Sequence, residues 1–187
     1  GYTAFTSREP HGVVAGIIPW NYPLQILARV AGAALAMGNT LVIKPAEDAS
    51  LTSLRIADLA LEAGCPAGVF NVVTGYGGEA GAALSAHPGV DYVTFTGSTG
   101  TGTAIQQAAA LNNRGVTMEL GGKSPQIVFA DADLDAAMPV LVNAIIQNGG
   151  QTCSAGSRVL VQREVYEKVA TALAERFSRL VGGPHDA

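Results

Sequence analysis

Gly12-Val13-Val14-Ala15-Gly16-Ile17-Ile18-Pro19 begins the stretch of sequence that decides the fold. This β-branched apolar run, ended by a proline, predicts a buried strand. Residues 24–37 follow with helical spacing of their apolar side chains and stop at Gly38, which predicts a left-handed helix cap. Thr40-Leu41-Val42-Ile43-Lys44, closed by Pro45, predicts a second short buried strand. This order of strand, helix and strand indicates an α/β fold with a mostly parallel sheet.

The same alternation continues along the chain. Further strands are predicted at residues 69–73, 91–95, 116–120, 126–129 and 157–162. Further helices are predicted at residues 51–63, 77–86, 99–111, 131–148 and 164–180, the last ended by Gly182-Gly183-Pro184. Ser50 and Gly64 are expected to bound the helix at 51–63. Asp131 or Asp133 is expected to cap the helix that precedes Asn148, and Pro139 to bend it. The Gly-rich seam that follows Leu120 predicts a boundary between residues 1–120 and 121–187.

Composition narrows the classes of function. The 187-residue chain is 48% hydrophobic and 14% charged, with a net charge of −4. The charged fraction lies below the usual ~25%, which predicts that much of the surface packs against a partner subunit or further chain. The absence of a Lys/Arg cluster argues against nucleic acid or a membrane surface as a partner, and no apolar run reaches the ~20 residues of a membrane span. Two cysteines and three scattered histidines indicate neither a disulfide framework nor a metal site, so a cytoplasmic protein is expected.

Cys153 lies in an unusual setting for a cysteine. It sits in the polar, Gly-rich stretch Gln147-Asn148-Gly149-Gly150-Gln151-Thr152-Cys153-Ser154, just after an apolar run. A thiol on such a loop can be approached by a substrate, and its thiolate is a strong nucleophile. On this stretch alone, an unreactive loop cysteine explains the pattern equally well.

The glycine-rich turns raise the question of a nucleotide site. Neither Gly75-Tyr76-Gly77-Gly78-Glu79-Ala80-Gly81 nor Gly97-Ser98-Thr99-Gly100-Thr101-Gly102 matches the G-x-G-x-x-G fingerprint. Gly97-Ser98 is the better candidate, because it lies between a predicted strand and a helix, where free backbone N–H groups attract phosphate. Lys44 and Glu47 at the end of another strand could face a ribose, or could be an ordinary solvated strand end.

Taken together, these windows resemble the aldehyde dehydrogenase superfamily, and the resemblance runs through nearly the whole chain. Five motifs carry it, in the family's order: Pro19-Trp20-Asn21-Tyr22-Pro23, Gly38-Asn39-Thr40 with Lys44-Pro45-Ala46-Glu47, Phe95-Thr96-Gly97-Ser98-Thr99, Glu119-Leu120-Gly121-Gly122-Lys123-Ser124-Pro125, and Gly150-Gln151-Thr152-Cys153. The resemblance implies a Rossmann-type parallel sheet with helices on both faces in residues 1–120, and the beginning of a catalytic α/β domain in residues 121–187.

The resemblance also implies a reaction, the oxidation of a small-molecule aldehyde to a carboxylic acid. Cys153 would be the nucleophile and would carry a thiohemiacetal and then a thioester. The Asn21 amide and the Cys153 backbone N–H would hold the oxyanion. Glu119, flanked by Met118 and Leu120, would be the base that activates water for hydrolysis.

The implied cofactor is NAD, with NADP as the alternative. Glu47 should accept from a ribose 2′-OH and repel a 2′-phosphate, which favours NAD. The residues expected along the cofactor are Ile17, Ile18, Pro19, Trp20, Lys44, Glu47, Gly77, Gly81, Phe95, Thr96, Gly97, Ser98 and Leu120. No metal is implied.

Three further expectations follow from the comparison with the family. Because its members are more than twice as long, the chain is expected to be an internal fragment, inactive or nearly so by itself, of a protein that forms homo-dimers or homo-tetramers. Arg29, eight residues after Asn21, could meet a distal substrate carboxylate, or could snorkel or pair within the subunit. Tyr22 is a second candidate for contact with the substrate. A coenzyme A-acylating enzyme and a non-catalytic chain on the same fold are the alternative functions, and Glu119 argues against the acylating route.

Overall fold

The computed structural model describes residues 1–183. The chain divides into two compact units, residues 1–120 and the residues that follow Leu120. Each unit has its own sheet and its own hydrophobic core.

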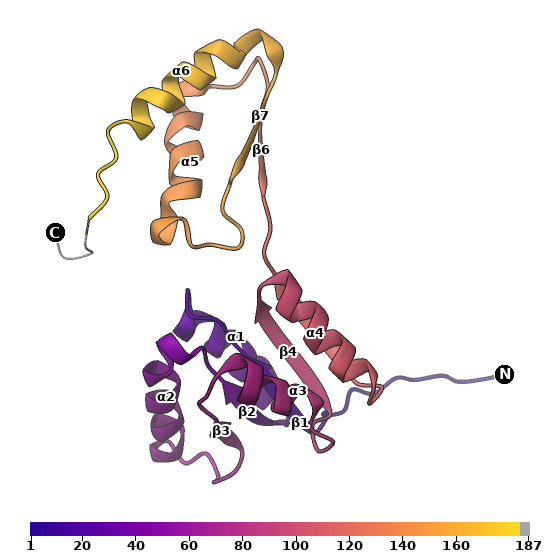
Figure 1. Ribbon diagram of the computed structural model, residues 1–187. Coiled ribbons are helices and arrows are strands. Elements are labelled where there is room, and N and C mark those ends of the chain that lie inside the picture. The colour runs from indigo at the N-terminus through magenta and orange to yellow at the C-terminus, as the bar shows by residue number, and fades with distance from the viewer. Residues whose placement is uncertain (184–187) are drawn as a thin grey trace. The chain divides into compact units, whose positions relative to one another are not determined.

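The first unit is built on a five-stranded sheet in which all paired strands are parallel (Figure 1). Its strand order is β3-β2-β1-β4-β5. The strands are β1 Val13–Ile17, β2 Thr40–Lys44, β3 Phe70–Val72, β4 Tyr92–Gly97 and β5 Gly115–Leu120. The chain therefore winds outward from β1 to β3, returns to the centre, and winds outward again through β4 and β5. The reversal places a topological switch point between β1 and β4, which is where open α/β sheets bind ligands.

Helices cover both faces of this sheet, as the sequence predicted. α1 (Pro23–Ala36) and α2 (Leu51–Glu62) pack on one face, where their apolar side chains join those of β1 and β2. α3 (Ala82–Ala86) and α4 (Thr99–Ala110) pack on the other face. Alternation along β1 supplies both cores, because Val14 belongs to the first cluster and Ala15 and Ile17 to the second.

Gly16 permits the close approach of α1 to the sheet. A Cβ atom at this position would lie 2.5 Å from Ile43 Cδ1 and 3.0 Å from Val30 Cγ1. Ile43 is fully buried, so the surrounding core has little room to yield.

Gly16→Val is therefore expected to lower the free energy of unfolding by about 1–3 kcal/mol through overpacking. Urea denaturation followed by circular dichroism measures the change. Gly32→Ala is the matched control, since a Cβ at Gly32 in the middle of α1 would meet no atom within 4 Å. That control should raise stability by about 0.5–1 kcal/mol. Equal midpoints for Gly16→Val and the unaltered chain would contradict the packing argument.

The second unit contains a two-stranded parallel sheet with helices packed on it. Its strands are β6 (Pro125–Val128) and β7 (Arg158–Val161). Its helical segments are α5 Leu134–Ile146, η3 Gln147–Gly150, η4 Arg163–Val165 and α6 Tyr166–Phe177. The core of this unit is formed by Val128, Met138, Leu141 and Val169.

Most predicted elements are present with ends shifted by a few residues, and the exceptions have local causes. The predicted helix at 77–86 is a π-helical segment, η2 (Gly77–Gly81), followed by the short α3, because three of the five residues of η2 are glycine. A short 3₁₀ turn, η1 (Glu47–Ala49), precedes Ser50, whose side chain makes no capping hydrogen bond.

The other predictions about the ends of helices have mixed outcomes. Gly38 and Gly64 adopt φ values of 79° and 91°, as predicted. Asp133 caps α5 by accepting from two backbone N–H groups, and α5 runs on through Pro139 without interruption. Pro184, expected to end the last helix, lies outside the described residues.

Candidate active site

The carboxyl ends of β1 and β4 form the centre of the candidate cofactor site. Ile17 and Phe95 are register partners at this edge, and the Ile18 N–H donates to the Lys44 carbonyl at 3.0 Å. The chain then leaves the sheet through Pro19 and Trp20, and half of the Trp20 side-chain surface is exposed. An exposed indole at the switch point offers apolar surface to a flat ligand.

The N-terminus of α4 lies beside this edge. Ser98 is the N-cap residue, and its hydroxyl accepts from the Thr101 N–H at 3.3 Å. The first turn of α4 contains no acidic residue, so the positive end of the helix dipole is not neutralised. Such a helix start fits an anionic group such as a pyrophosphate.

Two glycines let side chains pack directly beneath this helix start. A Cβ at Gly97 would lie 2.5 Å from the Phe95 ring, and a Cβ at Gly102 would lie 2.6 Å from Leu120 Cδ2. Phe95 is only 4% exposed, and Leu120 is half-buried against the same core. The Phe95 ring therefore packs directly against Gly97, in the Gly97-Ser98 turn that is the candidate phosphate site.

Lys44 and Glu47 form an ion pair at the end of β2. Lys44 Nζ lies 3.1 Å from Glu47 Oε2, and Lys44 is 3% exposed, whereas Glu47 is largely accessible. A hydrogen bond from its own backbone N–H lowers the pKa of the Glu47 carboxyl, and Lys44 lowers this pKa further through a hydrogen bond and its charge. The lowered pKa extends the pH range over which Glu47 is ionised further into the acid region. Any stability from the pair is therefore present above about pH 4.5 and is lost as the pH falls through the folded-state pKa.

Gly77 and Gly81, the two glycines of η2 predicted along the cofactor, lie in different environments. Gly81 is buried, and a Cβ there would lie 4.0 Å from Lys44 Cδ. Gly77 is exposed. The structure thus brings Gly81, Lys44 and Glu47 together in one part of the carboxyl edge.

Asn21 and Tyr22 lie in the turn between β1 and α1. Both are half-buried, and Tyr22 packs against the core beneath α1. The Tyr22 carbonyl accepts from the Ile26 N–H at 3.0 Å, which ties the turn to the start of α1. Pro23 occupies the first helical position, where its missing N–H costs nothing.

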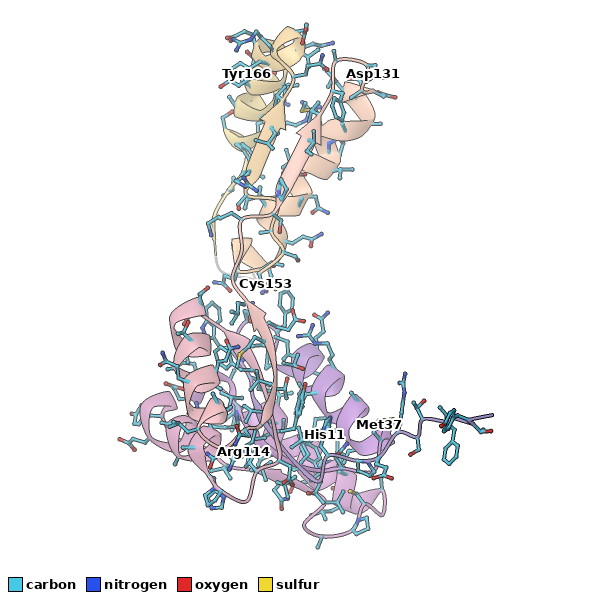
Figure 2. All side chains as sticks on the ribbon, turned by 90° about the vertical axis from the view of Figure 1, so that its right-hand side faces the viewer. His11, Met37, Arg114, Asp131, Cys153 and Tyr166 are labelled. Carbon is cyan, nitrogen blue, oxygen red and sulfur yellow. The ribbon has the colours of Figure 1, made fainter. Side chains whose placement is uncertain are left out.

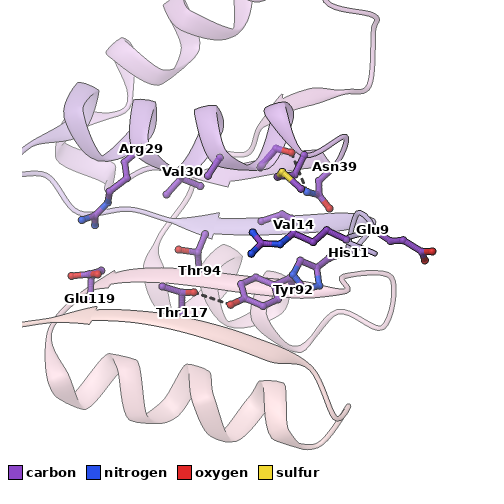
Figure 3. Close-up of a pocket in the computed structure, with 14 residues that line it drawn as sticks. Glu9, His11, Val14, Arg29, Val30, Asn39, Tyr92, Thr94, Thr117 and Glu119 are labelled. Carbon is purple, nitrogen blue, oxygen red and sulfur yellow. Dashed lines mark hydrogen bonds between the residues drawn. The ribbon is translucent and has the colours of Figure 1, made fainter. Parts of the chain in front are cut away.

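Glu119 lies near the end of β5 and lines a groove beneath α1 (Figure 3). The groove has a volume of about 520 Å³ and belongs entirely to the first unit. Its α1 side is mainly apolar, and Arg29 points into it from α1. Arg29 Nη2 donates to Thr96 Oγ1 at 3.4 Å.

The hydrogen bond between Arg29 and Thr96 bears on the roles predicted for both residues. The side chain of Thr96 faces the α1 side of the sheet, opposite to that of Phe95, so the two do not line the same surface. The hydrogen bond of Arg29 favours the alternative in which this guanidinium is used within the subunit. Contact between Arg29 and a substrate carboxylate stays a prediction.

Cys153 belongs to the second unit and lies on the loop between η3 and β7 (Figure 2). Its side chain is exposed. Three consecutive left-handed residues at the end of η3, Asn148 to Gly150, precede the loop, with φ values of 51°, 63° and 78°. Asn and Gly tolerate this conformation better than other residues, which explains the composition of the stretch.

The far end of the loop is fixed to the second unit by hydrogen bonds. The Gly156 N–H donates to the Ala144 carbonyl at 3.0 Å, and Gln126 Nε2 donates to the Gly156 carbonyl at 2.9 Å. A Cβ at Gly156 would lie 2.5 Å from Gln126 Nε2, so a larger residue there would displace the Gln126 amide that bonds to this segment. An exposed thiol on a loop with a fixed base suits a nucleophile that must meet its substrate in one geometry.

Among residues 1–183 there is no group of three or more His, Cys, Asp or Glu side chains that could hold a metal ion. In the same part of the chain, no helix has the length and apolar character needed to cross a membrane.

A doubly wound parallel sheet with an anion-ready helix start at its switch point defines the first unit as a Rossmann-type fold. The sequence pattern of the aldehyde dehydrogenase family matches residues 1–187, and the chain belongs to this family. A hydroxyisobutyraldehyde dehydrogenase of Mycolicibacterium austroafricanum is 53% identical over 98% of this chain and 36% of its own length. The chain therefore spans just over a third of that relative.

Solved structures agree with this assignment. The NAD⁺ complex of an aldehyde dehydrogenase from Bacillus cereus matches 92% of this chain and 35% of its own chain, with a TM-score of 0.89 and 51% identity. An NAD-dependent aldehyde dehydrogenase from Sinorhizobium meliloti matches 94% of this chain and 35% of its own, with a TM-score of 0.90 and 48% identity.

Proposed function

We propose that the protein containing this chain oxidises an aldehyde to a carboxylic acid through a covalent intermediate on Cys153. The observation that carries the proposal is the exposed thiol on a loop fixed at its base, in a chain that belongs to this family throughout its length. The composition and the fold are compatible with this chemistry. Cys153, Asn21 and Glu119 each have a separate role in it.

After the thiol proton has passed to solvent, Cys153 Sγ attacks the aldehyde carbon, and the carbonyl oxygen becomes an oxyanion that accepts hydrogen bonds from the Asn21 amide and the Cys153 N–H. Such donors are typically worth ~100-fold or more in turnover. A nicotinamide cofactor, when bound, supplies the acceptor for the hydride that leaves this carbon. Glu119 then takes a proton from water, which attacks the acyl group on Cys153 and releases the acid and the thiol.

NAD is the cofactor that the carboxyl edge fits best. The start of α4 at Gly97 and Ser98 would hold the pyrophosphate, and Lys44 with Glu47 would meet the ribose. Glu47 is a carboxylate at neutral pH, so it would accept from a 2′-OH and repel a 2′-phosphate. The NAD⁺ complex of the Bacillus cereus relative supports this choice.

Glu47→Gln is expected to shift cofactor preference toward NADP by about tenfold, which corresponds to about 1.4 kcal/mol. The cause is loss of the carboxylate that repels a 2′-phosphate. Isothermal titration with each cofactor measures the ratio of dissociation constants. Asp48→Asn removes the same charge one residue further on and should leave the ratio unchanged. Tighter binding of NADP than NAD by the unaltered chain would refute this role of Glu47.

Alkylation tests the proposed nucleophile directly. Iodoacetamide should label Cys153 faster than Cys65, because Cys153 is exposed and Cys65 is half-buried. NAD should change the rate at Cys153 and leave Cys65 unaffected, as measured by peptide mass spectrometry. Equal rates at both thiols, with no effect of NAD, would favour a non-catalytic chain on the same fold. The acylating alternative is tested by the Glu119 variant discussed below, since transfer to coenzyme A needs no hydrolytic base.

A further inference from the structure

Arg29 and Glu119 line one end of the groove in the first unit, and Thr96 lies next to both, bonded to Arg29 and paired in register with Glu119. Thr96 on β4 and Glu119 on β5 are register partners in neighbouring parallel strands. Register partners project from the same face of a sheet, and neighbouring strands lie only about 4.8 Å apart. Figure 3 shows the side chains of Arg29 and Glu119 directed toward each other from α1 and β5.

The donors at this end of the groove are only partly used. Thr96 Oγ1 accepts from Arg29 Nη2, so the hydroxyl proton of Thr96 points away from the guanidinium. Arg29 carries five N–H donors, and this bond uses one of them. Within residues 1–183 the Glu119 carboxylate makes neither a hydrogen bond nor an ion pair, and its side chain is exposed. Rotation about its side-chain bonds is therefore free to bring it to these donors.

We propose that Arg29 and Thr96 form a cradle that receives the Glu119 carboxylate after rotation of its side chain and holds it there in a resting position. Arg29 orients the Thr96 hydroxyl and contributes a charge-assisted N–H, while Thr96 contributes the second donor. Arg29 and Thr96 are positioning residues, since they act through Glu119. The cradle deepens the proposed function, on which it rests for the role of Glu119 as the base.

The remaining titratable residues that line the groove are Arg8, Glu9, His11 and Tyr92. Glu9 and His11 lie at the opposite end in Figure 3. Tyr92 Oη is engaged with Thr117 Oγ1 at 2.8 Å, and its ring stacks on His11.

The cradle has a catalytic consequence. A base on an exposed strand end would otherwise sample all its staggered rotamers, and only some of them bring the carboxylate to a given water. A resting position defined by two donors limits the rotamers that Glu119 adopts. It keeps the carboxylate at one end of the groove. The energy of the cradle should be modest, because exposed ion pairs contribute little, and so Glu119 can leave it during turnover.

Side-chain NMR of the 187-residue chain tests the cradle without any need for turnover. Three-bond couplings from the backbone to Glu119 Cγ report its χ1 rotamers, and an NOE can join the Glu119 methylene to the Thr96 methyl. The unaltered chain should show couplings of one dominant rotamer together with this NOE. Thr96→Val and Arg29→Leu should each give couplings averaged over several rotamers.

Conservative variants separate positioning from a purely structural effect. Thr96→Ser keeps the hydroxyl and Arg29→Lys keeps the charge, so both should retain most of the wild-type couplings. Thr117→Val is the matched control, because it removes a hydroxyl two residues before Glu119 on the same strand, where that hydroxyl is bound to Tyr92. Backbone amide spectra identify any variant that fails to fold, and the conservative pair then decides the question.

Two results would overturn the proposal. One is averaged Glu119 couplings in the unaltered chain. The other is wild-type couplings in both Thr96→Val and Arg29→Leu. A cradle seen by NMR together with unchanged turnover in a Glu119→Gln enzyme would instead overturn the role of Glu119 as base, so the two failures are distinguishable.

Discussion

Replacing Cys153 with alanine is expected to abolish aldehyde oxidation, with kcat/KM falling by about 10⁴- to 10⁶-fold. Loss of a nucleophile removes the covalent route altogether, and the remaining groups cannot replace it. The experiment requires a protein of the relatives' full length that contains residues 1–187, since the chain spans 36% of the hydroxyisobutyraldehyde dehydrogenase relative. Initial rates with a simple aliphatic aldehyde and NAD measure the loss.

Two observations make this test specific to the thiol. Cys153 lies on an exposed loop, so alanine there should leave the unfolding midpoint unchanged. Cys65→Ala is the control, because it removes the other free thiol, which packs against the core of the first unit. It should lower stability but leave the rate per folded molecule intact. Robust turnover by the Cys153→Ala protein would exclude the proposed intermediate.

Glu119→Gln is expected to separate the two halves of the reaction. The same full-length protein should release about one equivalent of NADH in a burst and then turn over about 10²- to 10⁴-fold more slowly. Glutamine has nearly the same shape as glutamate but cannot take a proton from water. The acyl group should therefore accumulate on Cys153, where mass spectrometry can detect it.

Glu9→Gln is the matched control for this experiment. It makes the same charge change at a second carboxylate that lines the same groove, away from Glu119 in Figure 3. Its burst and its steady state should both match those of the unaltered enzyme. If Glu119→Gln turned over at the normal rate, Glu119 would not be the base, and the acylating alternative would gain support.

The local elements were largely predictable because neighbouring residues determine them. The β-branched run at 13–17 forms β1, and Gly38 ends α1 in the left-handed conformation, as the sequence indicated. The failure at 77–86 also has a local cause, since repeated glycine weakens an α-helix enough for a π-helical segment to form. Ser50 failed as a side-chain cap because the 3₁₀ turn before it already places its backbone in the helical region.

The candidate site likewise contains some features that the sequence could predict and others that it could not. Lys44 and Glu47 are three residues apart, and their pairing could be anticipated from that spacing. The facing of Thr96 was missed, although alternation along β4 carried the signal: Val93 and Phe95 are core residues of one face, and Thr96 must point to the other. The register pairing of Thr96 with Glu119 had no sequence signal, because it depends on which strands become neighbours.

By itself, the sequence determined the order and kind of the elements, the family, and the identity of the candidate nucleophile, base and oxyanion donor. These properties follow from short-range patterns and from motifs that lie within a few residues of one another. Only the tertiary structure decided the strand order β3-β2-β1-β4-β5, the switch point between β1 and β4, and the groove that joins Arg29 to Glu119. The physical reason is that a strand's neighbours are chosen by burial of its two faces against helices far away in the chain, and no local pattern specifies that choice.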